Sequence, residues 1–111
     1  MFSTVLNYKN MKKGRTYTIG NYRYKVTNAN TSGKGTVTVT GIKTKSLKSI
    51  AIRDTVKIGG KTFKITTIGN AAFKNCKKAA KATVGKNVKT IQANAFNNCK
   101  ELKKSTVKII N

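Results

Sequence analysis

The sequence contains no histidine, no proline and no tryptophan, and it has only two acidic residues, Asp54 and Glu101. General acid–base catalysis near neutral pH usually depends on a histidine or on a tuned pair of carboxyl groups. Two acids that lie 47 positions apart, with two cysteines and no histidine, do not compose an ordinary zinc or calcium shell either. We therefore expect no enzyme, no cofactor and no metal site, although a lysine or cysteine nucleophile stays possible in principle.

Long apolar runs are also missing. No stretch approaches the roughly 18 apolar residues that a membrane-spanning helix needs. The first nine residues have neither a charged segment nor an apolar segment of the kind found in signal peptides, so none is predicted. A length of 111 residues is that of one domain with a modest core.

The scarcity of acids leaves a formal net charge of +22 from 24 lysines and arginines. Such a charge attracts polyanions, namely nucleic acid, teichoic acid or sulfated polysaccharide. Only three of the 24 bases are arginines, and the blend of Lys, Asn, Ile and Thr is also what an AT-rich coding sequence produces. No arginine-rich docking motif is present, so we expect nonspecific attraction to nucleic acid rather than sequence readout.

What is present is a repeat. Residues 68–78 match residues 91–101, with isoleucine, phenylalanine and cysteine each 23 positions apart, and a 23-residue period lies within the range of leucine-rich repeats. Residues 47–52 carry a third copy of the spacing Leu-x-x-Ile-x-Ile, 32 positions before the second copy. The nine surplus residues fall at 57–65, where a Gly-Gly pair between β-prone runs predicts a hairpin.

The full pattern Leu-x-x-Ile-x-Ile-x-x-x-Val-x-x-Ile-Gly-x-x-Ala-Phe-x-x-Cys resembles the BspA-type leucine-rich repeat of bacterial surface proteins, over roughly residues 36–110. The resemblance implies a secreted or surface-exposed protein that is involved in adhesion or protein binding. Residues that depart from the family pattern are small or charged. Ala79, Ala82 and Ser105 replace large apolar residues, and Arg53 and Gly85 replace the usual proline after the strand.

We accordingly predict an α/β fold, a right-handed leucine-rich-repeat solenoid with a short parallel sheet. Strands are expected around positions 50/52, 82/84 and 105/107, and single helical or 3₁₀ turns at 72–73 and 95–96. The residues expected to be buried are Ile50, Ile52, Phe73, Cys76, Val84, Val88, Ile91 and Phe96.

The N-terminal third is not repeated. Gly20-Asn21 separates two alternating segments at 16–19 and 22–27, which predicts a β-hairpin, and a strand is expected at 36–40. We divide the chain into a β cap at 1–40 and about two and a half repeats at 41–111 with a hairpin insertion at 57–65. Tyr17, Tyr22 and Tyr24 are interpreted as residues that pack the cap, with a stacking platform for bases or sugars as the alternative.

Cys76 and Cys99 occupy the same position in adjacent repeats. The favoured interpretation is a ladder of small, buried, inert thiols. A disulfide or a redox thiol is the alternative, which parallel side-chain directions disfavour.

The outward residues of the predicted sheet are the candidate binding surface, because leucine-rich repeats commonly bind through that face. We expect a protein or an acidic surface polymer of a host or neighbouring cell as partner, with a merely solvated face as the alternative. The chain itself is expected to be a monomer or to associate weakly through its C-terminal turn, because an uncovered strand edge tends to pair. The candidate face consists of Ser49, Arg53, Lys81, Thr83, Lys104, Thr106 and Lys108.

Overall fold

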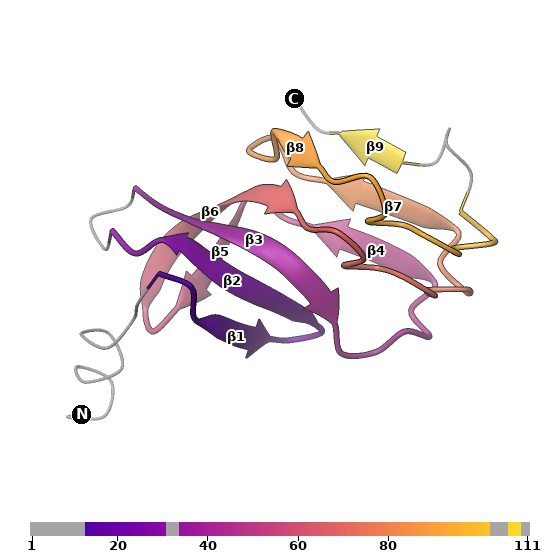
Figure 1. Cartoon of the computed structure of the whole chain (residues 1–111), viewed down its shortest axis with the longest axis horizontal. Helices are drawn as coiled ribbons and strands as arrows, with labels where there is room; N and C mark the ends of the chain where they lie inside the picture. The colour runs from indigo at the N-terminus through magenta and orange to yellow at the C-terminus, as the bar shows by residue number, and fades with distance from the viewer. Residues whose placement is uncertain (1–12, 31–33, 103–106, 110–111) are drawn as a thin grey trace.

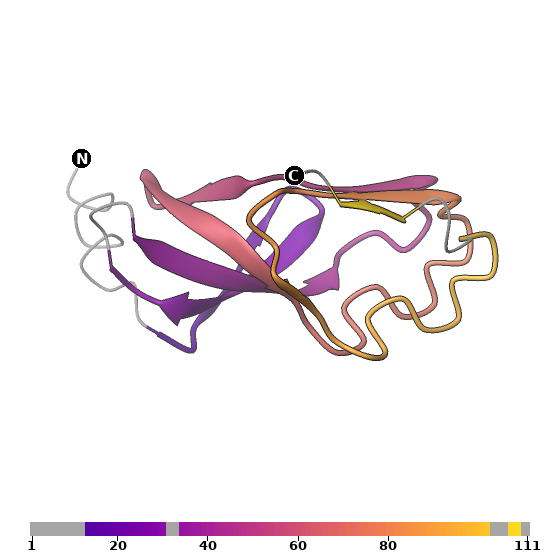
Figure 2. The same cartoon turned by 90° about the horizontal axis from the view of Figure 1, so that it is seen from above.

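The computed structural model describes residues 13–30, 34–102 and 107–109, and for the last three residues only the course of the backbone. The molecule is elongated, with extents of 44 × 26 × 19 Å. Figure 1 shows two curled sheets side by side, and Figure 2 shows that they form two separate layers joined by stacked turns.

The larger sheet has six strands in the order β1-β2-β3-β6-β5, with β8 paired to the end of β6. The first three strands are antiparallel, β3 and β6 are parallel, and β5 and β6 form an antiparallel hairpin. β8 continues the parallel part next to β6. The strands are β1 (Thr16–Ile19), β2 (Tyr22–Asn28), β3 (Gly35–Ile42), β5 (Thr55–Ile58), β6 (Lys61–Ile68) and β8 (Thr90–Ile91).

The smaller sheet is parallel and has three strands, β4 (Ser49–Ile52), β7 (Lys81–Val84) and β9 (Val107–Ile109), in that order. Ile50 lies opposite Ala82, which lies opposite Val107. Each successive coil therefore adds one strand to this sheet. The register of β4 with β7 has the predicted offset of 32 residues, whereas β9 pairs with β7 at an offset of 25, two more than the predicted 23. Strands β3, β6 and β8 form the corresponding parallel ladder on the other side of the coils, in which Val39 pairs with Ile68 and Ile68 with Ile91.

Glycines with positive φ turn both hairpins. Gly20 (φ 62°) starts the turn between β1 and β2, which confirms the hairpin predicted from Gly20-Asn21. Gly59 and Gly60 have φ values of 60° and 81° between β5 and β6. Positive φ at both central residues defines the type I′ turn, whose twist matches that of the flanking strands.

The predicted helical turns are not found in the described residues, where 72–73 and 95–96 lie in hydrogen-bonded turns instead. Two backbone N–H groups that a helix would use internally donate to the next coil: Phe73 to the carbonyl of Ala95 (2.8 Å) and Asn75 to that of Asn97 (2.9 Å). Asn75 also has a positive φ of 66°, which a right-handed helix does not allow. The α component of the predicted fold class is therefore unsupported. The handedness of the coils and the division at residue 40 stay predictions.

The core runs through both sheets without a break. In the larger sheet it is built from branched and aromatic residues, including Val26, Val37 and Phe63, each fully buried. Six of the eight residues that were predicted to be buried are buried, with exposed fractions from 0% for Phe73 to 8% for Val88. Ile91 and Phe96 are half-buried. Both belong to the last coil, and Phe96 stacks one face of its ring on Phe73, with 5.3 Å between the ring centroids.

Candidate functional site

The outward face of the smaller sheet arises from the alternation of its strands. Ile50 and Ile52 point into the core, so the residues between and beside them point outward. Ser49 lies opposite Lys81, and Ala51 lies opposite Thr83. Ser49, Arg53 and Lys81 are exposed and Thr83 is partly exposed.

The remaining candidate residues of this face are in the third strand. Lys108 lies opposite Thr83 in the backbone register of β9. Lys104 and Thr106 lie outside the described residues. Within the described part, the structure thus brings Ser49, Lys81 and Thr83 into one patch, with Arg53 just beyond the end of β4.

Among the described residues, no ion pair joins either acid to this patch. The Asp54 carboxylate accepts a hydrogen bond from the Lys86 N–H (2.9 Å), and the Asp54 carbonyl accepts one from the side chain of Asn87 (3.0 Å). Asp54 therefore joins the first coil to the second. Glu101 borders an open hollow of about 400 Å³ whose other charged residues are Lys48, Lys77 and Lys78. Both the face and this hollow are thus dominated by positive charge.

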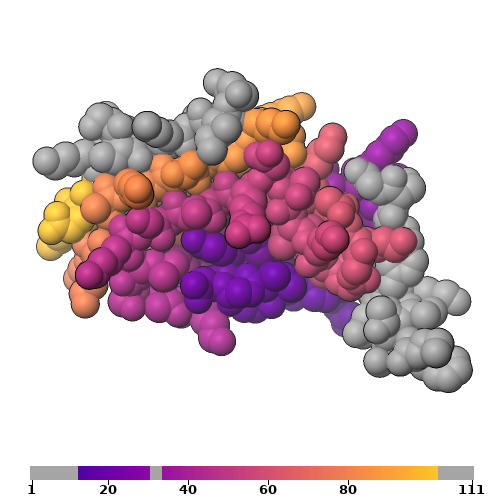
Figure 3. All heavy atoms as spheres, turned by 180° about the vertical axis from the view of Figure 1, so that it is seen from behind, coloured from indigo at the N-terminus to yellow at the C-terminus, as the bar shows by residue number. Residues whose placement is uncertain are grey.

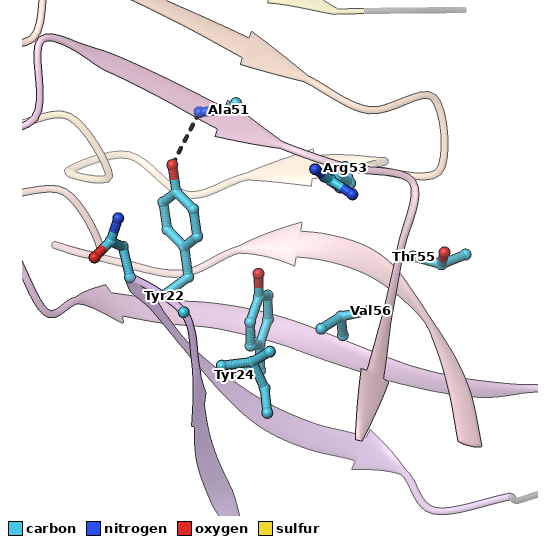
Figure 4. A pocket seen from close by; sticks show the side chains of 9 residues that line it. Tyr22, Tyr24, Ala51, Arg53, Thr55 and Val56 are labelled. Atoms are coloured by element: carbon cyan, nitrogen blue, oxygen red, sulfur yellow. Dashed lines mark hydrogen bonds between the residues drawn. The ribbon is translucent and has the colours of Figure 1, made fainter. Parts of the chain in front are cut away.

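A second hollow, of about 290 Å³, lies between the two sheets and is here called the junction pocket. Figure 3 shows the N-terminal hairpin, in indigo, packed directly beside the magenta surface of the segment around β4. In Figure 4, Tyr22 and Tyr24 rise from β2 towards β4, and Arg53 faces them from the other side. The pocket is lined by Ile19, Gly20, Asn21, Tyr22, Tyr24, Ala51, Arg53, Thr55 and Val56.

Tyr22 connects the two sheets. The Ala51 N–H donates a hydrogen bond of 3.0 Å to the Tyr22 hydroxyl, drawn in Figure 4, on the side of β4 that has no neighbouring strand among the described residues. The Tyr22 ring packs edge-on against Phe73, with 6.1 Å between centroids. A covered edge amide cannot recruit a foreign strand. This contact supports the packing role for Tyr22.

Tyr24 is different. It is only 5% exposed, yet its hydroxyl has no hydrogen-bond partner among the described residues. Every fully enclosed side-chain polar atom in that part of the chain has a partner, so this hydroxyl must border the junction pocket. Burial, and secondarily the neighbouring Tyr22, raises the pKa of Tyr24 to about 12, against a smaller opposing effect of Arg53. Tyr24 is therefore a neutral phenol, able to donate a hydrogen bond.

Arg53 supplies the charge of the junction pocket. Its side chain is exposed and makes no ion pair within the described ranges. No acidic residue lines the pocket. The sequence predicts Arg53 on the binding face but gives no sign of its proximity to the tyrosines, which are about 30 positions away. The available signal was the i, i+2 spacing of Tyr22 and Tyr24, which puts both rings on one face of a strand.

The two cysteines are free and buried, on adjacent coils. The Cys99 thiol donates to the Phe73 carbonyl at 3.0 Å. Burial, followed by the neighbouring Cys99, raises the pKa of Cys76 to about 11, and burial also raises the pKa of Cys99. Protonated, enclosed thiols are poor nucleophiles and poor metal ligands, which supports the inert ladder. In the described ranges, no three His, Cys, Asp or Glu side chains gather to hold a metal ion.

The repeat pattern matches a known family over more of the chain than the structure describes. The family model "BspA type Leucine rich repeat region (6 copies)" matches residues 2–110. No curated protein matches the sequence significantly. Among the described residues there is also no helix long and apolar enough to cross a membrane.

Solved structures of bacterial leucine-rich-repeat proteins have the same architecture. A leucine rich cell surface protein of Faecalibacterium prausnitzii is similar at 28% identity with a TM-score of 0.70, over 88% of this chain and 24% of that protein. Leucine-rich-repeat proteins of Bacteroides ovatus (27%, TM-score 0.66, 84% and 22%) and Bacteroides capillosus (26%, TM-score 0.68, 85% and 64%) are also similar. This chain thus spans about a quarter of the length of the first two proteins and somewhat under two thirds of the third.

Proposed function

Because the chain belongs to the BspA-type leucine-rich-repeat family, we propose that it is a non-enzymatic module that binds a protein partner outside the cell. The observation that carries the proposal is the row of exposed polar and basic side chains across β4 and β7, Ser49 beside Lys81 and Thr83 beside Ala51. A parallel sheet holds such a row rigidly, and rigid rows of alternating side chains suit the recognition of a macromolecular surface.

A location at the cell surface and a role in adhesion are part of the same proposal. The supporting observation is that a similar protein from Faecalibacterium prausnitzii is described as a cell surface protein. The partner is a surface protein of a neighbouring or host cell that presents acidic groups, because the face and the open hollow beside it are positively charged.

The test is binding of the labelled chain to bacterial and epithelial cells, measured by flow cytometry before and after the cells are treated with protease. A protein partner predicts that protease removes most of the binding. Lys81→Glu, on the face, is compared with Lys57→Glu, which is also an exposed position, on β5, with the same change in charge. Lys81→Glu should reduce binding at least tenfold and Lys57→Glu less than twofold. Equal losses in the two variants would refute binding through this face.

Charge-driven binding of a polyanion is the second candidate function. It is favoured by the net charge of +22 and by the hollow lined by Lys48, Lys77 and Lys78. Its signature is salt dependence, since release of counterions makes affinity fall steeply and linearly on a log–log plot. If binding survives 0.5 M salt, the face-mediated proposal holds. If binding collapses with salt, is insensitive to protease and falls equally in both lysine variants, the polyanion function replaces it.

A further inference from the structure

The junction pocket combines three features that a solvated crevice does not need. It holds an arginine without an ion-pair partner in the described ranges, a tyrosine that is only 5% exposed and whose hydroxyl has no partner there, and no acidic residue in its lining. A buried polar group normally has a hydrogen-bond partner, because leaving it unpaired is unfavourable. The Tyr24 hydroxyl and the Arg53 guanidinium are thus both left available to a ligand.

We propose that the junction pocket is an anchor site for the carboxylate of an aspartate or glutamate side chain on the protein partner. This inference rests on the proposed function and adds to it the chemistry of the partner's central contact. Arg53 provides the positive charge and the planar fork that pairs with a carboxylate, and the Tyr24 hydroxyl donates a further hydrogen bond. Thr55 and Asn21 add polar groups at the walls.

The size and the composition of the pocket favour a side chain over a larger group. A volume of about 290 Å³ is at the lower end of the range for small-molecule sites, so one side chain or one sugar unit fits and a longer oligomer does not. Ile19 and Val56 give the pocket apolar walls against which the methylene groups of glutamate can pack. Tyrosine and arginine are also the residues that most often dominate protein–protein binding energy.

The position of the pocket ties it to the binding face. Arg53 follows the last residue of β4, so the pocket opens at one end of the row that contains Ser49 and Lys81. A partner that covers this row can place one acidic side chain in the pocket at the same time. Addition of a partner strand at this edge of β4 is disfavoured, because the outward amide of Ala51 already donates to Tyr22.

The experiment uses the blocked amino acids N-acetyl-glutamate amide and N-acetyl-glutamine amide as probes, which differ by one charged group. Binding to the ¹⁵N-labelled chain is followed by NMR at 0.15 M and 0.5 M salt. Binding of the glutamate probe should shift the amide signals of Ala51, Arg53 and Thr55, and its dissociation constant should be at least tenfold lower than that of the glutamine probe. Glucuronate and glucose are titrated in parallel, because a sugar acid carries the same carboxylate.

Variants identify the groups responsible. Arg53→Gln should weaken the glutamate probe at least tenfold, whereas Arg15→Gln, which removes the same exposed charge away from the pocket, should change it less than twofold. Tyr24→Phe should weaken the probe three- to tenfold while thermal unfolding of the free protein stays unchanged, since no described group of the protein uses that hydroxyl. Arg53→Lys should bind the glutamate probe more tightly than Arg53→Gln does, but less tightly than the unchanged protein does.

Each contrary result has a distinct meaning. Equal affinity for the glutamate and glutamine probes would overturn the carboxylate site. Equal losses of affinity in Arg53→Gln and Arg15→Gln would do the same. Neither result would contradict binding through the face. Tenfold tighter binding of glucuronate than of the glutamate probe would overturn the assignment to a protein side chain in favour of an acidic sugar. Failure of the proposed function is measured separately, as cell binding that protease does not remove and that Lys81→Glu and Lys57→Glu reduce equally.

Discussion

The larger sheet and the stacked coils are held together in different ways. In the larger sheet, the interior consists of side chains that fill space, such as Val26, Val37 and Phe63, all fully buried. In the coils, many interior positions are alanine or cysteine, among them Ala79 and Ala82, which are also fully buried. The first region is stabilised mainly by burial of apolar area, and the second depends more on its backbone hydrogen bonds from coil to coil.

This difference shows how a short solenoid can be stable. Small residues let the backbones of adjacent coils approach to hydrogen-bonding distance, as in the bond from the Phe73 N–H to the Ala95 carbonyl. They also contribute less burial energy per residue, so the coils rely on the larger sheet beside them. Tyr22 is one link between the two regions, since it contacts both Phe73 and the edge amide of Ala51.

The largest expected effect is the loss of a large core side chain from the first region. Phe63→Ala should destabilise the protein by about 3–5 kcal/mol, the usual cost of a cavity left by phenylalanine. Phe96→Ala, in the last coil and only half-buried, should cost about 1–2 kcal/mol. Urea unfolding of both variants measures the difference, and equal losses would contradict the proposed contrast.

The next effect concerns the close approach of the coils. A Cβ at Gly85 would lie 2.6 Å from the Arg53 carbonyl carbon and 2.7 Å from its oxygen, which are backbone atoms that cannot move aside. Gly85→Ala should therefore cost about 1–3 kcal/mol through overpacking. Gly41→Ala is the matched control, because its nearest contact is the flexible end of Arg23 at 3.4 Å. It should change stability by less than about 1 kcal/mol, and similar melts for the two variants would show that the coils are not closely packed there.

A smaller effect separates the two tyrosines of the junction pocket. Tyr22→Phe removes the acceptor of the Ala51 N–H and should cost about 1 kcal/mol. Tyr24→Phe removes a hydroxyl with no partner in the described part of the chain, so stability should stay constant within about 0.5 kcal/mol or rise slightly. Thermal unfolding of both variants measures this, and a loss of stability in Tyr24→Phe equal to that in Tyr22→Phe would mean that the Tyr24 hydroxyl has a structural role.

The last expected effect is a dependence of stability on pH. The pKa of Cys76 is raised from 9.0 to about 11, so the folded state holds this proton more tightly than the unfolded chain does. Its contribution to stability is complete below pH 9 and declines as the pH rises from about 9 to about 11. Chemical unfolding at pH 8, 9 and 10 should show this decline, and it should be shallower in the variant Cys76→Ala/Cys99→Ala. Identical slopes in the two proteins would show that the thiols are not the cause.

Much of the fold follows from periodicity in the sequence. The repeat predicts a parallel sheet of three strands, and its 32-residue offset is the register of β4 with β7. β9 pairs with β7 at an offset of 25 residues, two more than the repeat predicts. The Gly-Gly and Gly-Asn pairs identify both hairpins, since glycine adopts the positive φ that their turns require. The helical turns predicted at 72–73 and 95–96 are not found in these described segments, because local propensity does not show that an N–H group such as that of Phe73 donates to a neighbouring coil.

The sequence by itself determined the repeat, the family and the composition of the candidate face, since these depend on spacing and residue type along one chain. Only the tertiary structure decided what lies at the junction of the two sheets. Tyr22 and Tyr24 meet Arg53 there because β2 and β4 belong to different sheets that the chain packs side by side. Contacts between sheets depend on how layers pack, and no local pattern encodes the distance between residues that are about 30 positions apart in the chain.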